Sequence, residues 1–113
     1  MKIAVTAWGN RVSPVFDSAR TLLIAGIENK SVSHTTYVSF HPGDIQGLSV
    51  LLKRLGVPIL ICGAISTSPA EALTENRIKL ISFVSGNALE ILATFARRNA
   101  IDTVHMMPGS PLR

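Results

Sequence analysis

The sequence predicts a three-layer α/β/α domain built on a five-stranded mixed sheet, and three observations indicate this class. The chain has 113 residues, of which 47% are hydrophobic and 16% charged, a balance that supports one packed core. Apolar runs in the first 40 residues have the length of strands and are joined by short connections. Beyond residue 44, apolar runs alternate with segments of helical periodicity, as in parallel crossover units.

The first part of the chain is predicted to form an antiparallel meander of strands. Residues 3–7 are an apolar run typical of a buried strand, and 20–28 form a second run of the same kind. Residues 34–40 alternate β-branched and aromatic side chains with polar ones. The polar connection between the second and third runs contains Asn29, a residue suited to a hairpin turn.

The second part of the chain is predicted to alternate helices and strands. The segments are a helix from Asp44 to Leu55, a strand at 59–62, a short helix from Pro69, a strand at 77–84 and a helix from Ala88 that closes at 99–102. Gly56 suits the end of the first helix, and Thr67 or Ser68 could cap the second. The order β-β-β-α-β-α-β-α is compatible with a ribonuclease-H-like fold.

Residues 1–102 are therefore expected to form a single domain, followed by a tail at 103–113 without a clear period. The single cysteine, Cys62, excludes an internal disulfide, and the absence of a signal-peptide pattern favours the cytoplasm. No apolar run approaches the roughly 20 residues that a membrane span needs.

The charge of the chain does not indicate nucleic-acid binding. The formal net charge is +4, but the basic residues are scattered, without a basic run or interleaved aromatics. The carboxylates do not gather at the centre of the predicted sheet, where a nuclease of this fold class would need them for two metal ions. We therefore expect a protein that is not an enzyme.

Several short motifs together indicate a family. They are Met1–Val5, Arg11–Pro14 with Phe16, Leu23–Ile24, Ile27–Glu28, Ile61–Ile65, and Ile78–Lys79 leading to Ser85–Gly86. In order and spacing the chain resembles the dinitrogenase iron–molybdenum cofactor biosynthesis family over roughly residues 1–98. The resemblance implies a ribonuclease-H-like fold and a non-catalytic role. That role is to bind or carry an iron–sulfur cluster or a precursor of a nitrogenase-type cofactor, with cofactor-assembly proteins as partners.

The chain departs from that family in its first loop. The family commonly reads Arg-Val-x-x-His-Phe-Gly, whereas this chain has Val15 in place of the histidine and Asp17 in place of the glycine. Valine has no donor atom, so the loop lacks its best metal ligand.

The candidate site joins the loop at 9–17 with the turn at 62–66, because turns that follow neighbouring parallel strands share one sheet edge. Its predicted cofactor-binding residues are Asn10, Arg11, Ser13, Phe16, Cys62, Gly63 and Ser66. Cys62 is the predicted metal ligand, although a free cysteine more often serves as a small buried hydrophobic residue. Phe16 has a competing interpretation as a core residue, and Arg11 as a brace for loop carbonyls.

Two other functions remain open from the sequence. One is a metal-free interaction or regulatory domain, with a homodimer formed through a sheet edge or the tail. The other is a small-anion-binding module that uses the Gly63–Ser68 and Ser85–Asn87 turns at the starts of two helices. For each serine and threonine of these turns, helix capping is the alternative role.

Overall fold

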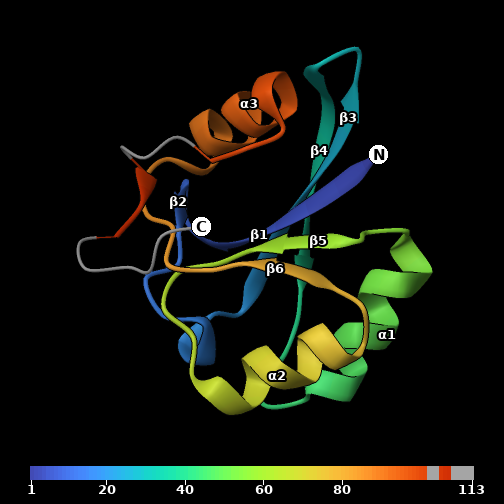
Figure 1. The fold of residues 1–113 in the computed structure, drawn as a ribbon, viewed down its shortest axis with the longest axis vertical. Coiled ribbons are helices and arrows are strands. Elements are labelled where there is room, and N and C mark those ends of the chain that lie inside the picture. The colour runs from blue at the N-terminus through green and yellow to red at the C-terminus, as the bar shows by residue number, and fades with distance from the viewer. Residues whose placement is uncertain (102–104, 108–113) are drawn as a thin grey trace.

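The computed structural model describes residues 1–101 and 105–107 (Figure 1). The elements in chain order are β1 (Lys2–Trp8), β2 (Arg11–Val12), the 3₁₀ helix η1 (Phe16–Ser18), β3 (Thr21–Glu28), β4 (Ser31–Ser39), α1 (Ile45–Leu55), β5 (Ile59–Ile61), α2 (Thr67–Glu75), β6 (Lys79–Ile81) and α3 (Ala88–Arg98). The predicted α/β class is confirmed. Each helix in the described residues is too short or too polar to span a membrane.

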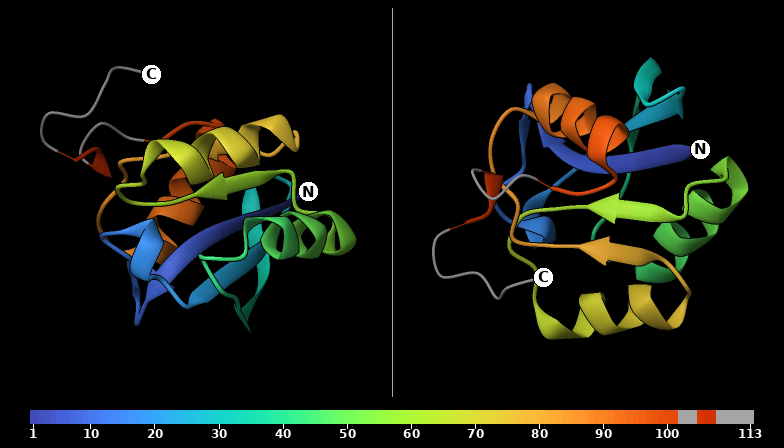
Figure 2. Two further views of the ribbon diagram at one scale, coloured as in Figure 1. Left: turned by 90° about the horizontal axis from the view of Figure 1, so that it is seen from below. Right: turned by 45° about the horizontal axis from the view of Figure 1, so that its top comes forward.

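The sheet has the order β4-β3-β1-β5-β6. β3 runs antiparallel to both β1 and β4, whereas β5 is parallel to β1 and β6 is parallel to β5. The mixed sheet of five strands is thus as predicted, and the short β2 adds a sixth strand that pairs with the end of β1. Helices α1 and α2 cover one face and α3 covers the other (Figures 1 and 2).

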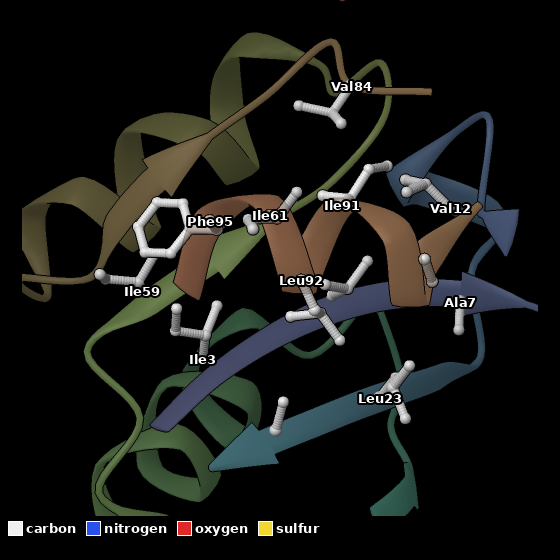
Figure 3. Packing of buried hydrophobic residues seen from close by; sticks show 13 residues of the cluster. Ile3, Ala7, Val12, Leu23, Ile59, Ile61, Val84, Ile91, Leu92 and Phe95 are labelled. Atoms are coloured by element: carbon white, nitrogen blue, oxygen red, sulfur yellow. The ribbon is translucent and has the colours of Figure 1, made fainter. Parts of the chain in front are cut away.

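The face under α3 is a layer of aliphatic side chains (Figure 3). Ile91, Leu92 and Phe95 of α3 are buried against Ile3 of β1 and Leu23 of β3. Full burial of one such side chain contributes roughly 1.5–3 kcal/mol of transfer free energy. The stripe of apolar residues in α3 therefore fixes the helix over the middle of the sheet.

The opposite face is closed by α1, α2 and the loop that contains η1. Leu48 and Leu52 of α1 and Leu73 of α2 are buried over Leu60 of β5. Phe16 of η1 belongs to the same cluster, and its ring lies 5.9 Å from the ring of Phe40 between centroids. The loop after β1 is therefore anchored in the core by one aromatic side chain.

The hairpin between β3 and β4 follows the chemistry of its turn. Asn29 and Lys30 have φ angles of 52° and 62°. Positive φ at both central residues is the geometry of a type I′ turn, which matches the twist of antiparallel strands. This geometry explains the position of Asn29 in the sequence.

Three local predictions need correction. β6 covers only Lys79–Ile81, shorter than the predicted 77–84, because Phe83 has a φ of 62° and turns the chain out of the strand. α2 begins at Thr67 with Ser66 in the N-cap position, two residues before the predicted start. The first loop also contains β2 and η1, which were not predicted.

Candidate functional site

Three connections meet at the edge of the sheet where β1, β5 and β6 end. They are the loop between β1 and β3, the turn between β5 and α2, and the turn between β6 and α3. Isolated bridges join Val15 to Ala64 and Arg11 to Asn87, so the first loop lies against both turns. The expectation that the first loop and the turn at 62–66 share one edge is confirmed, and the turn before α3 lies at the same edge.

The first loop is fixed to the β5–α2 turn by reciprocal backbone hydrogen bonds. Phe16 N–H donates to the carbonyl of Ala64 at 2.8 Å, and Ala64 N–H donates to the carbonyl of Pro14 at 2.9 Å. A side chain on Gly63 would collide with the carbonyl oxygens of Ser13 and Pro14. Glycine is therefore required at position 63 by the close approach of two backbone segments.

The β6–α3 turn holds the other end of the same loop. Val12 N–H donates to the carbonyl of Gly86 at 3.0 Å, and Ala88 N–H donates to the carbonyl of Asn10 at 2.9 Å. The side chain of Asn87 caps α3 by accepting a bond from Glu90 N–H at 3.0 Å. The start of α3 and the first loop thus form one hydrogen-bonded unit.

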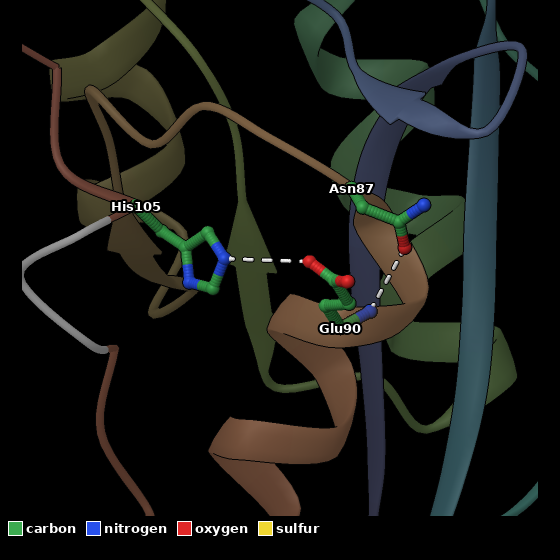
Figure 4. A network of polar contacts seen from close by, with 3 residues as sticks. All are labelled: Asn87, Glu90 and His105. Atoms are coloured by element: carbon green, nitrogen blue, oxygen red, sulfur yellow. Dashed lines mark hydrogen bonds and ion pairs between the residues drawn. The ribbon is translucent and has the colours of Figure 1, made fainter.

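The C-terminal segment at 105–107 pairs with the β6–α3 turn through backbone hydrogen bonds. His105 O accepts a bond from Ser85 N–H at 2.7 Å, and Met107 N–H donates to Phe83 O at 2.8 Å. The His105 imidazole has its Nε2 3.9 Å from a carboxylate oxygen of Glu90 (Figure 4). The boundary predicted at 102/103 and most of the predicted tail lie outside the described residues.

An open pocket of about 570 Å³ lies on the outer side of the first loop. Its lining comes from the end of β1, the loop and the start of β3: Ala7, Trp8, Gly9, Ser13, Pro14, Val15, Ser18, Ala19, Arg20 and Thr21. Trp8 is 72% exposed and Val15 is 42% exposed, so both present apolar surface to solvent. Arg20 is the cation of this lining, and its guanidinium donates to the carbonyl of Ala19 at 3.0 Å.

Cys62 lies in the core under the loop. Its side chain is fully buried in the cluster covered by α1 and α2. Burial, and to a smaller degree the Asp17 carboxylate, raises the pKa of the thiol from 9.0 to about 12. Because metal ligation needs the thiolate, the structure does not favour Cys62 as a ligand in this conformation.

The predicted binding residues of the first loop have separate surroundings. Phe16 is a core residue, which corrects its assignment to a ligand surface. Ser13 lines the pocket, but its hydroxyl donates to the carbonyl of Val15 at 3.2 Å. Asn10 and Arg11 are exposed at the hairpin of β1 and β2, outside the pocket lining.

Ser66 and Asp17 meet at the start of α2. The Ser66 hydroxyl lies 3.1 Å and 3.2 Å from the two carboxylate oxygens of Asp17 and donates to them. An anion at this helix start would meet the Asp17 carboxylate at close range. This contact argues against an anion site at the turn that contains Gly63 and Ser66.

Within residues 1–101 and 105–107, His, Cys, Asp and Glu side chains form no group of three that could hold a metal ion. Ser13 is the one residue of the predicted binding set among the described residues that line the pocket, and the prediction missed Trp8, Val15 and Arg20 in particular. One signal in the sequence could have located Arg20. It directly precedes β3, which runs antiparallel to β1, and the start of such a strand lies beside the end of its neighbour.

The fold and the pocket define a small α/β domain with a ligand-sized hollow beside the end of its central strand. The chain belongs to the dinitrogenase iron-molybdenum cofactor family, whose family model matches residues 1–98. The loop and both turns of the site lie inside that range. No curated protein matches the chain.

Solved structures show the same fold at low sequence identity. The protein PH0822 is 21% identical, with a TM-score of 0.76, over 90% of this chain and 94% of that one. The apo form of the orange protein from Desulfovibrio gigas is 19% identical, with a TM-score of 0.66, over 99% of this chain and 96% of that one. These likenesses support the arrangement of the elements.

Proposed function

We propose that this chain is a non-catalytic carrier that binds an anionic metal–sulfur cofactor, or a precursor of the nitrogenase-type cofactor, in the pocket of the first loop. The pocket carries the proposal, because it is formed by the loop that contains the family motif and it combines Trp8, Val15 and Arg20. Membership of the cofactor family supports the class of ligand.

The size and polarity of the pocket agree with such a ligand. Its volume of about 570 Å³ lies within the range of ordinary ligand sites. Among the described residues that line it, Arg20 supplies a positive charge and none supplies a carboxylate. Trp8 and Val15 offer apolar surface to the sulfide faces of a cluster, while Arg20 pairs with its negative charge.

The mode of binding follows from the donors available. Val15 has no donor atom and the Cys62 thiol is buried and protonated. We therefore propose that a preformed cofactor is held by charge and contact rather than by a thiolate bond. Binding without a strong protein–metal bond suits a carrier, because release then needs no ligand exchange.

The pocket also supports a role without catalysis. Its lining within the described residues contains no histidine or acid to act as a general acid or base. The hydroxyls of Ser13 and Ser18 both donate to the carbonyl of Val15, at 3.2 Å and 3.3 Å. A serine nucleophile would need an adjacent base instead.

Binding of isolated iron–molybdenum cofactor, added anaerobically, tests the proposal. Trp8 is the chain's single tryptophan, so its fluorescence reports on this pocket. We expect quenching that saturates with one cofactor per chain, and Arg20→Gln to weaken binding by about tenfold, the effect of one lost charge pair. Arg97→Gln, an exposed change on α3, serves as the control and leaves binding unchanged.

A second probe separates this mode from thiolate ligation. Reconstitution with iron and sulfide would give charge-transfer absorption in the wild type, lost in Cys62→Ala, if Cys62 were a ligand. We expect Cys62→Ala to bind the isolated cofactor as the wild type does. Loss of binding in that variant, with Arg20→Gln unaffected, would contradict the proposed pocket.

A further inference from the structure

β4 (Ser31–Ser39) forms an outer edge of the sheet (Figure 1). Its inner side pairs with β3, and no other strand of the described residues pairs with its outer side. The strand is largely solvent-exposed, with Tyr37 56% exposed. An unpaired edge of this length is a template for pairing with another strand.

The register shows which backbone groups point outward. Phe40 N–H donates to Arg20 O at 3.0 Å, so these two residues form a hydrogen-bonded pair. Hydrogen-bonded and non-hydrogen-bonded pairs alternate along an antiparallel ladder, so Val38 and Thr36 also direct their backbone groups toward β3. The N–H and C=O groups at 35, 37 and 39 therefore point away from the sheet.

The segment Thr35–Ser39 of β4 lacks the features that usually prevent an exposed edge strand from pairing. Proteins protect edges with charged residues, proline or β-bulges. Between Ser31 and Ser39 the strand contains neither proline nor any Lys, Arg, Asp or Glu. A register shift beside Gly26 and Ile27 disturbs only the first part of the strand, and the segment from Thr35 to Ser39 remains regular.

The character of this edge favours a second copy of the same chain as its occupant. Two identical strands that pair antiparallel about a two-fold axis place the outward N–H groups of each opposite the outward C=O groups of the other. Since β4 carries no formal charge, two copies meet there without like-charge repulsion, although each chain has a net charge of +4. The opposite edge of the sheet is β6, which has only three residues. It is too short to pair well with β4 of another copy, so an open chain of copies is not favoured.

We propose that the segment Thr35–Ser39 of β4 is a self-association edge, through which two copies of this chain join their sheets antiparallel into one continuous sheet. The proposal does not rest on the cofactor pocket, because no residue of β4 lines it. Cross-strand contacts among threonine, tyrosine and serine side chains would add to the backbone bonds of this interface.

Sedimentation of the full chain over roughly 10 µM to 1 mM tests the association. We expect the mass to rise toward twice that of the monomer and to stop there, as a closed two-fold interface requires. A mass that stays monomeric throughout, or that grows beyond the dimer, would overturn the proposal.

Amide hydrogen exchange identifies the edge that is used. At low concentration, the amides of Tyr37 and Ser39 should exchange quickly, while those of Thr36 and Val38 are protected by β3. At high concentration, Tyr37 and Ser39 should gain at least about tenfold protection, because their N–H groups become bonded. Equal protection of these amides at both concentrations, in a sample that dimerises, would place the interface elsewhere and refute the proposal.

A matched pair of variants gives the final test. Thr35→Lys with Tyr37→Lys brings like charges together across the proposed interface and should leave the chain monomeric. Val50→Lys with Leu89→Lys adds the same charge at positions that are 60% and 51% exposed on helices, and should dimerise like the wild type. Equal loss of dimer in both variants would show that net charge, not the β4 edge, controls association.

Discussion

Cys62 and Gly63 follow each other directly after β5, and Gly63 lies in contact with the backbone of the first loop. Cys62 points into the core, whereas Gly63 lies where the first loop crosses the chain. The chain has left β5 at Ile61, so the environment changes from one residue to the next. Whether a reactive residue type is available to a ligand therefore depends on its direction, which the sequence does not state.

Cys62 should behave as a protected thiol. In the folded chain at pH 8 we expect iodoacetamide to modify it at least about a hundredfold more slowly than in the unfolded chain, because burial raises its pKa from 9.0 to about 12. The raised pKa also predicts that stability falls between these two pH values, since the unfolded chain releases the proton first. The difference in free energy of unfolding between wild type and Cys62→Ala, followed across that pH range, measures the effect. A difference independent of pH would contradict it.

Gly63→Ala should be destabilising by about 1–3 kcal/mol, because its Cβ would meet two backbone carbonyls that cannot move independently of the loop. Gly43→Ala is the matched control, since a Cβ at that turn would meet no atom within 4 Å. We expect the control to change stability by less than about 0.5 kcal/mol. Denaturant titration measures both values, and equal effects would exclude the close approach as the cause.

The residues of the pocket show how much of the site the sequence could predict. Its position at the first loop was predictable, since strand, loop and strand follow one another with motif residues between them. The sequence did not show that the aromatic residue of the pocket is Trp8 and not Phe16. Both are aromatic residues near the loop, and only the fold shows that Phe16 is buried while Trp8 is exposed.

At the scale of elements, helix boundaries are set by capping residues nearby in sequence, whereas strand boundaries are set by contacts with distant parts of the chain. α1 has the side chain of Asp44 as its N-cap and Gly56 with a φ of 72° at its end, as the sequence indicated. β6 is shorter than its apolar run, because the chain leaves the sheet to meet the first loop and the C-terminal segment. Helix caps depend on residues next to the helix in sequence. The contacts that end β6 depend on residues far away in sequence.

Asn87→Ala should weaken the start of α3 by about 1 kcal/mol, since Glu90 N–H loses its side-chain acceptor. Asn87→Asp keeps an acceptor oxygen and should retain most of the stability. The free energy of unfolding measures this difference. Amide exchange at Ala88 shows in addition whether the bond to Asn10 opens with the cap, and unchanged exchange would mean that loop and helix are not coupled.

At the scale of the whole molecule, the family match ends at residue 98, but the structure adds a segment that pairs with Phe83 and Ser85. A chain that ends at residue 101 should therefore keep its fold and lose about 1–3 kcal/mol, the value of two backbone bonds. Thermal unfolding followed by circular dichroism measures the loss. His105→Ala, which keeps the backbone bonds, should lose less, and an unfolded truncated chain would contradict the expectation.

The bonds from Phe16 to Ala64 and from Ala88 to Asn10 also bear on the time at which the pocket can form. They join the first loop to parts of the chain that leave the ribosome much later. Contacts between distant segments form only after the entropy of closing the intervening chain has been overcome. In a nascent chain that has not yet extended past α3, the first loop therefore lacks some of the hydrogen bonds that hold it. The pocket therefore reaches its final form only when the whole domain has been synthesised.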